Sequence, residues 1–279
     1  MTKNKLFLGL CSAAALLLLL ALFATVLLLQ GGKKLPEQTA QEETEARTTL
    51  PPPVENVFTP KDFAYEGDYL TCLTDESVLG IDVSKFQGQI DWQQVKDAGV
   101  EFAIIRLGYR GYGAAGGLNE DTLAQENYRG AKKAGLKVGA YFFSQAITVE
   151  EAVEEANYAM ELVRDWELEM PLVYDWECLA DDYRTVGVDA RLLTDCTIAF
   201  CDTVAKAGYA PMIYFNPEQS RKQMYLEELT EYGFWLAMYT DQMEYPYKVD
   251  MWQYTNEGTV PGISGNVDIN LYFPYEEAA

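Results

Sequence analysis

The chain has 279 residues, 49% of them hydrophobic and 13% aromatic, with 43 acidic residues, 21 basic residues and no histidine. The lack of histidine excludes a Ser-His-Asp triad, a Cys-His dyad and a histidine-ligated zinc site. The formal net charge of −22 argues against a nucleic-acid partner, because phosphate contacts need an excess of lysine and arginine. Acid–base chemistry in this chain therefore depends on carboxylates, tyrosines and cysteines.

The first hydrophobic segment spans residues 6–29, which are 24 residues without a charged side chain. A helix needs about 20 apolar residues to cross a bilayer, whereas the apolar part of a cleaved signal peptide is about 7–15 residues long. The sequence therefore predicts an uncleaved transmembrane signal anchor at 6–29, after a cytoplasmic stub at 1–5. The lipid bilayer is the expected partner of this segment, and secretion after cleavage is the less favoured alternative.

The next segment, residues 30–76, is rich in Glu, Thr and Gln and contains three consecutive prolines at 51–53. Such a composition buries little apolar surface, so an extended linker is predicted here. Beyond Cys11 in the apolar segment, no cysteine pair has CxxC spacing, and one or two disulfide bridges or free buried thiols are both open. These cysteines are Cys72, Cys178, Cys196 and Cys201.

From residue 78 onward, β-rich apolar runs alternate with helical segments. This alternation predicts right-handed βαβ units with a parallel sheet, and eight strands predict a barrel. The predicted fold class is α/β: an irregular (β/α) barrel over 77–279, with about five β/α units followed by three strands with few helices. The predicted strands are 80–84, 102–109, 137–144, 171–176, 211–215, 234–239, 251–254 and 267–271, and the predicted helices are 92–98, 123–134, 149–164 and 191–207.

Carboxylates stand at the ends of three predicted strands, where such barrels carry their active sites. Asp82 ends the first strand, Asp268 lies in the last, and Asp175 and Glu177 end the fourth. Side chains alternate along a strand, so Asp175 and Glu177 should share one face, about 7 Å apart. Like charges raise each other's pKa, which provides the protonated acid and the ionised partner that a glycosidase uses. Glu177 is predicted to be the proton donor, and Asp175 the ionised partner.

Other interpretations of these carboxylates are helix capping or pairing with Arg106, and a magnesium or calcium site built from four oxygen ligands. The metal ranks below acid–base chemistry because no ligand-dense loop is present, so no metal and no cofactor are predicted. Aromatic residues near the strand ends could stack on sugar rings, although about half of them are expected to pack in the barrel core instead. The aromatic candidates for sugar contact are Tyr141, Tyr214, Tyr239 and Trp252.

Seven motifs in order resemble glycoside hydrolase family 25, the lysozymes that cut bacterial peptidoglycan. The opening motif is GIDVSKFQGQIDW at 80–92, and LVYDWE at 172–177 resembles the catalytic fourth strand of the family. The resemblance covers about residues 78–273 and no matched position is missing. The other motifs are FAIIRLGY at 102–109, GAYFFS at 139–144, WLAMY at 235–239, MWQY at 251–254 and GNVDIN at 265–270.

This resemblance implies hydrolysis of the β-1,4 bond between N-acetylmuramic acid and N-acetylglucosamine in peptidoglycan glycan strands. Glu177 would be the general acid/base, and Asp175 would orient the 2-acetamido group of the substrate if that group acts as an internal nucleophile. Asp82 and Asp268 would line the site and position these two groups. The four aromatic candidates, together with Arg106, would bind substrate.

The predicted protein is thus a membrane-anchored muramidase of a bacterial cell membrane, with the N-terminus inside and the catalytic domain outside. Two alternatives stay open. One is a catalytically silent wall-binding module, which needs the aromatic residues but not the carboxylates. The other is a hydrolase of another N-acetylated glycan, such as chitin.

Overall fold

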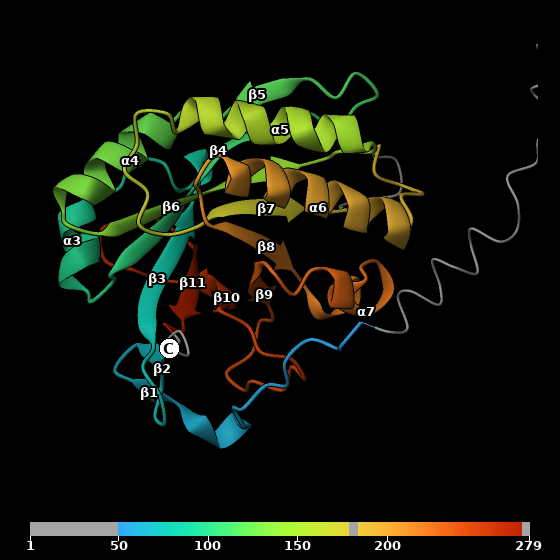
Figure 1. The fold of residues 1–279 in the computed structure, drawn as a ribbon. Coiled ribbons are helices and arrows are strands. Elements are labelled where there is room, and N and C mark those ends of the chain that lie inside the picture. Colours follow the sequence, from blue (N-terminus) through green and yellow to red (C-terminus); the bar gives the residue numbers. More distant parts are fainter. Residues whose placement is uncertain (1–49, 179–183, 275–279) are drawn as a thin grey trace, which may run out of the picture. The chain divides into compact units, whose positions relative to one another are not determined.

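A closed barrel of eight strands forms the centre of the described chain (Figure 1). The computed structural model describes residues 50–178 and 184–274. Neighbouring barrel strands run parallel, except that the last strand is antiparallel to both of its neighbours. The predicted α/β barrel class is confirmed. In order around the barrel, the strands are β3 (Val78–Val83), β4 (Phe102–Arg110), β6 (Lys137–Ser144), β7 (Leu172–Trp176), β8 (Pro211–Phe215), β9 (Gly233–Ala237), β10 (Met251–Gly258) and β11 (Val267–Tyr272).

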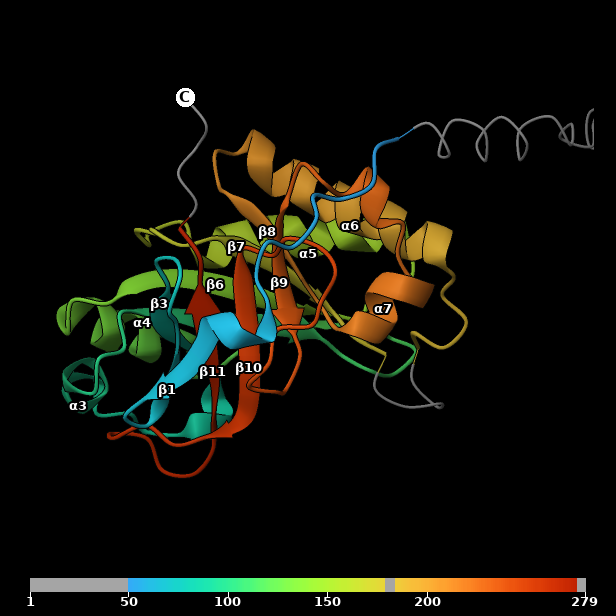
Figure 2. The same cartoon turned by 90° about the horizontal axis from the view of Figure 1, so that it is seen from below.

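Helices cover only part of the barrel wall. In Figures 1 and 2, α5 and α6 lie side by side outside the strands, and no described helix lies between β9 and β11 in the chain. Four helices overlap the predicted ones, whereas the six-residue α7 was not predicted. The signal for it is Asn216 followed by Pro217, an N-cap residue with proline at the first helical position. The helices are α3 (Trp92–Asp97), α4 (Ala124–Lys133), α5 (Val149–Leu162), α6 (Ala190–Lys206) and α7 (Pro217–Lys222).

The barrel interior is a packed core, which apolar side chains fill below the strand ends. Two glycines make room in this narrow space. A Cβ on Gly80 would lie 2.2 Å from the ring of Phe102, and one on Gly139 would lie 2.7 Å from Ile104 Cδ1. Side chains larger than hydrogen therefore do not fit at either position. The buried inner residues are Phe102, Ile104, Met170, Val173, Met212, Trp235 and Met251.

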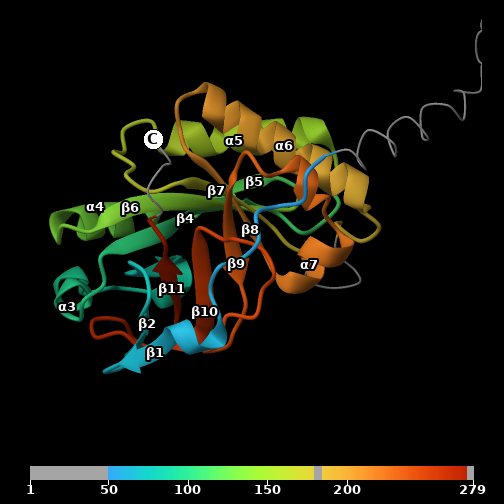
Figure 3. The same cartoon turned by 60° about the horizontal axis from the view of Figure 1, so that its bottom comes forward.

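A hairpin and a short helical turn precede the barrel, within the segment predicted to be an extended linker. The 3₁₀ turn η1 (Pro60–Asp62) leads into β1 (Phe63–Glu66) and β2 (Tyr69–Cys72), which lie beside β10 and β11 in Figures 2 and 3. Phe63 is buried, and its ring centroid is 5.1 Å from that of Trp252. The linker prediction is therefore wrong for this part of the chain, because Phe58, Phe63 and Leu70 are buried in the core around the barrel. Residues 30–49 lie outside the described residues.

The predicted stub at 1–5 and signal anchor at 6–29 also lie outside the described residues. Within 50–178 and 184–274, no helix has the length and apolar content required to cross a membrane.

The four described cysteines are free thiols, so the alternative of disulfide bridges among them is not realised. Cys178 is exposed, and the other three are buried. The two that share α6, Cys196 and Cys201, pack in the core outside the barrel wall.

The remaining short elements complete the description. β5 (Leu118–Glu120) pairs antiparallel with the end of β4 and was not predicted. The 3₁₀ turns η2 (Lys85–Gln87) and η3 (Leu226–Glu228) follow β3 and α7.

Candidate active site

A pocket of about 220 Å³ opens where the parallel strands end. The structure brings together in it the four carboxyl groups that the sequence analysis selected: Asp82, Asp175, Glu177 and Asp268 all line the pocket. Arg106 is the one basic side chain among its described lining residues. The catalytic roles of these groups stay predictions, but the expected geometric convergence is present.

A larger hollow of about 840 Å³ lies beside α3 and α4. Its only carboxylate among the described lining residues is Asp91, which caps α3 by accepting from the backbone N–H of Gln94. Among the described residues, this hollow therefore lacks the pair of acidic groups that the smaller pocket has.

Because side chains alternate along a strand, Asp175 and Glu177 at the end of β7 both face the pocket. Val173 lies in the inner core, whereas Tyr174 faces outward against Phe200, with ring centroids 4.8 Å apart. Asp175 and Glu177 follow Val173 in the same phase and line the pocket.

The antiparallel direction of β11 brings the other two acids together. Asp268 is directly opposite Asp82 in the register of β11 and β3. All four carboxyl groups thus reach one pocket from three strands.

A hydrogen-bonded network holds Asp82. Its Oδ2 accepts from Gln253 Nε2 at 2.8 Å and from Asn270 Nδ2 at 2.9 Å. Each amide is fixed in turn, because Gln253 Oε1 accepts from the Tyr214 hydroxyl and Asn270 Oδ1 accepts from Trp235 Nε1, both at 2.8 Å. Two donors on one carboxylate oxygen favour its ionised form.

Burial and mutual repulsion favour protons on the pocket carboxyls. Burial raises the pKa of Asp82 to about 6, although the hydrogen bonds from Asn270 and Gln253 oppose the increase. Burial and the neighbouring Asp82 raise the pKa of Glu177 to about 7 and that of Asp268 to about 8.

The surroundings of Asp175 oppose the ionised form that was predicted for it. Burial, then Glu177 and Asp82, raise the pKa of Asp175 well above its ordinary value. Its Oδ1 is buried and accepts no hydrogen bond from the described residues. The burial of Asp175 thus favours its protonated form, and its role as the ionised partner stays a prediction.

The raised pKa values of these carboxyls predict that the protein loses stability as the pH rises. Their pKa values of about 6, 7 and 8 exceed the ordinary values near 4, so between about pH 4 and 8 the folded state binds more protons than the unfolded chain. The free energy of unfolding therefore falls as the pH rises through this window. By differential scanning calorimetry we expect a lower Tm at pH 8 than at pH 5, by about 2–4 °C for each kcal/mol lost. Asp268→Asn should flatten this dependence, and a Tm that rises from pH 5 to pH 8 would contradict the assignment.

Arg106 lines the pocket but is paired elsewhere. Its Nη2 and Nε lie 2.7 and 2.8 Å from Asp121 Oδ2, outside the pocket, and its guanidinium lies 4.8 Å from the ring centroid of Phe86. The alternative in which Arg106 neutralises the pocket carboxylates is thus not the arrangement observed. Its positive charge still opposes the increase in the pKa of Asp175.

Three of the four aromatic candidates lie at the pocket. Tyr141, Tyr214 and Tyr239 line it, and Tyr239 is 54% exposed. A further aromatic residue, Phe86, also lines the pocket and is 75% exposed, so the pocket has two exposed rings for an apolar sugar face.

The fourth candidate, Trp252, is not in the pocket, which corrects the prediction of a sugar contact. The side chain is fully buried on the outer face of β10, where Nε1 donates to the Met238 carbonyl at 2.8 Å and the ring packs against Phe63. Its neighbour Gln253 faces the pocket, so strand alternation directs Trp252 the opposite way.

Several residues that build the site were not predicted to have a role in it. Asp82 accepts hydrogen bonds from Gln253 and Asn270, and Asn270 accepts one from Trp235. The pocket is also lined by Trp235 and Phe86. The signal for Asn270 was available, because it is two residues from Asp268 and therefore on the same face of β11. Phe86 follows the strand in a 3₁₀ turn, where alternation gives no orientation.

The metal-binding alternative receives no support from the arrangement of side chains. In the two described ranges, no group of three or more His, Cys, Asp or Glu residues could hold a metal ion.

A pocket with paired carboxyls at the strand ends of an α/β barrel is an arrangement that glycoside hydrolases use. Residues 81–263 match the family model described as glycosyl hydrolases family 25, and the chain belongs to this family.

Similar proteins include two lysozymes and an autolysin. The chain is 27% identical over 195 residues to an autolytic lysozyme of Clostridium acetobutylicum, covering 69% of this chain and 55% of that protein. The modular autolysin LytC from Streptococcus pneumoniae, solved with a synthetic peptidoglycan ligand, has a TM-score of 0.63 and 26% identity, covering 71% of this chain and 47% of that one. The bacterial lysozyme from Streptomyces coelicolor has a TM-score of 0.56 and 27% identity, covering 73% of this chain and 94% of that one. The chain thus spans about half the length of the first two proteins.

Proposed function

We propose that the protein is a muramidase that hydrolyses the β-1,4 bond between N-acetylmuramic acid and N-acetylglucosamine in peptidoglycan. The observation that carries this proposal is the Asp175–Glu177 pair, which lies with two further carboxyls in the pocket of a family 25 barrel. The names of the relatives, a lysozyme and an autolysin solved with a peptidoglycan ligand, support the same substrate class.

In this proposal, Glu177 is the general acid/base. It is half-buried, and burial together with Asp82 raises its pKa to about 7, so that it carries a proton at neutral pH for a substantial fraction of the time. Glu177 gives this proton to the leaving glycosidic oxygen. It then takes a proton from the water that completes hydrolysis.

Asp175 is proposed to hold the 2-acetamido group of the substrate. Asp175 lines the pocket together with Glu177, and its carboxyl would accept a hydrogen bond from the acetamido N–H. The acetamido carbonyl oxygen would then bond to the anomeric carbon as the glycosidic bond breaks, and water would open the resulting ring. This sequence retains configuration without a nucleophile from the protein.

The other pocket residues are proposed to position these groups and the sugar. Asp82, held by two amides, raises the pKa values of both paired acids through its charge, and Asp268 raises that of Asp175. Tyr239, which is exposed, and the half-buried Tyr141 and Tyr214 offer rings and hydroxyls to the glycan. Arg106 contributes charge from the pocket wall.

Product analysis tests this function. Digestion of purified peptidoglycan should release fragments whose new reducing ends are N-acetylmuramic acid, as identified by mass spectrometry after borohydride reduction. New N-acetylglucosamine ends, or cleavage of chitin oligosaccharides alone, would replace the muramidase by another glycan hydrolase. Binding to peptidoglycan without new reducing ends would indicate a silent wall-binding module.

For the remaining chain, we propose that residues 6–29 anchor the protein in a bacterial membrane, with the N-terminus inside and the barrel outside. The support is the apolar segment of 24 residues without a charge. Peptidoglycan outside the cell would then be within reach of the anchored enzyme.

A further inference from the structure

Two buried glutamines bind the main chain that carries Glu177. Gln145 Nε2 donates to the Glu177 carbonyl at 2.6 Å, and Gln219 Nε2 donates to the Trp176 carbonyl at 2.8 Å. Both side chains are buried. β7 ends at Trp176, whose last partner in β6 is Ser144, so these two carbonyls lie where the regular ladder stops.

Gln219 is itself fixed by the start of α7. Its Oε1 accepts from the backbone N–H of Asn216 at 3.0 Å, and the Asn216 side chain accepts from the backbone N–H of Gln219, also at 3.0 Å. This reciprocal capping box leaves the Nε2 group of Gln219 directed at β7.

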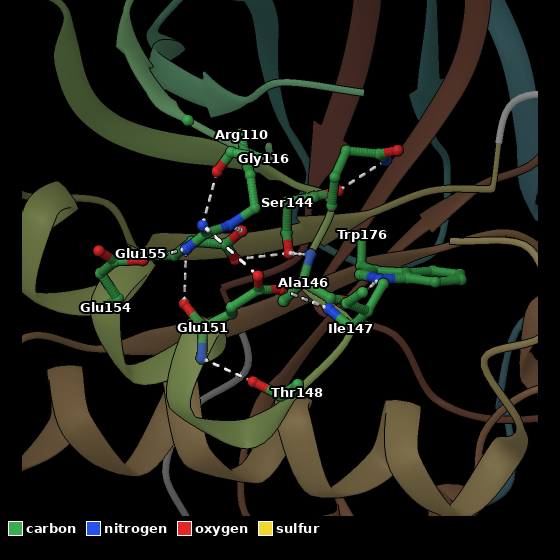
Figure 4. Close-up of polar contacts among 12 residues, drawn as sticks. Arg110, Gly116, Ser144, Ala146, Ile147, Thr148, Glu151, Glu154, Glu155 and Trp176 are labelled. Carbon is green, nitrogen blue, oxygen red and sulfur yellow. Dashed lines mark hydrogen bonds and ion pairs between the residues drawn. The ribbon is translucent and has the colours of Figure 1, made fainter. Parts of the chain in front are cut away.

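Gln145 lies between Ser144 and Ala146, in a turn that a buried ion pair holds. Figure 4 labels these two neighbours and the ion pair of Arg110 and Glu155. Glu155 of α5 accepts from the Ser144 hydroxyl at 2.5 Å and from Arg110 Nε at 2.7 Å. Gln145 also donates to the Ser144 carbonyl at 2.8 Å, so its amide bridges the ends of β6 and β7.

The turn contacts β7 a second time. The Ala146 carbonyl accepts from Trp176 Nε1 at 2.9 Å, a contact visible in Figure 4. Trp176 and Glu177 are therefore restrained from the β6 side by two hydrogen bonds and from the α7 side by one.

We propose that Gln145 and Gln219 are positioning residues that fix the carboxyl of Glu177 in the pocket. The inference depends on the proposed function, in which Glu177 moves the proton. Neither glutamine touches the substrate in this role. An acid displaced by about 1 Å loses about 100-fold in rate, so restraint of its main chain is a catalytic requirement.

The test replaces each amide by a thioether of similar shape, in Gln145→Met and Gln219→Met. The full chain is assayed on a soluble tetrasaccharide of alternating N-acetylglucosamine and N-acetylmuramic acid. We expect kcat to fall about 10- to 100-fold in each variant while KM stays within about twofold, because substrate contacts are unchanged. The matched control is Gln125→Met: Gln125 Oε1 accepts from Trp166 Nε1 at 3.1 Å, on α4 and away from the pocket, and this variant should keep the wild-type kcat.

A double variant that carries both Gln145→Met and Glu177→Gln distinguishes a loss of positioning from a general loss of structure. Without an acid to position, Gln145→Met should leave the residual kcat of Glu177→Gln unchanged, whereas a structural defect would lower it further and overturn the proposal. Wild-type kcat in both methionine variants, with Glu177→Gln inactive, would also overturn it. If Glu177→Gln itself kept full activity, the proposed function would fail first.

Discussion

Substitution of Glu177 by glutamine is expected to lower kcat for peptidoglycan hydrolysis by about 10²–10⁴-fold. The amide keeps the size of the side chain but cannot give a proton to the leaving oxygen. Because the pocket walls are unchanged, KM should change little, and the loss should be seen in single-turnover reducing-end assays as well as in turbidity.

The control for this substitution is Glu218→Gln. Glu218 is exposed on α7 and pairs with Lys222 at 2.9 Å, outside the pocket. The Glu218→Gln variant should retain full activity. Wild-type rates in Glu177→Gln would remove the general acid from the proposed mechanism, whatever the result at Glu218.

Substitution of Arg110 by methionine is expected to lower the free energy of unfolding by about 3–5 kcal/mol at pH 8, because it leaves a buried carboxylate without its cation. Arg110 Nε lies 2.7 Å from Glu155 Oε1, and both side chains are buried. Burial raises the pKa of Glu155 to about 7, so Glu155 is ionised at pH 8 and largely protonated at pH 5. The cost should therefore be smaller at pH 5. Urea unfolding at the two pH values measures it.

An exposed pair supplies the comparison for Arg110. Arg164 pairs with Glu161 at 2.5 Å with both side chains 64% exposed, so Arg164→Met should change the unfolding free energy by less than about 0.5 kcal/mol. Equal losses of unfolding free energy in the two variants would show that burial does not make the ion pair of Arg110 more stabilising than an exposed one.

Much of the barrel was predictable because its signals are local. Apolar β-rich runs and C-cap glycines mark the strands and helices, and period-two alternation assigns Asp175 and Glu177 to one face. Trp252 was predicted to contact sugar from its position near a strand end and from the family resemblance, without use of this rule. Alternation from its neighbour Gln253, which lines the pocket, places Trp252 on the outer face of β10.

The parts of the site that escaped prediction depend on contacts between distant segments. Gln145 and Gln219 act on carbonyls 32 and 43 residues away, and no local pattern marks a glutamine for that role. The pKa of Asp175 likewise depends on its burial, which follows from the packing of several strands. The positions of the charged residues in the sequence do not reveal how deeply Asp175 is buried.

The N-terminal hairpin has a practical consequence for recombinant work. The compact unit that contains the barrel starts at Pro51, and Phe63 of β1 covers the outer face of Trp252. An expression fragment that begins at residue 77, the boundary suggested by composition, would uncover this indole and the aromatic residues around it. Such a truncation should aggregate, whereas a fragment that begins at residue 51 should stay monodisperse in size-exclusion chromatography.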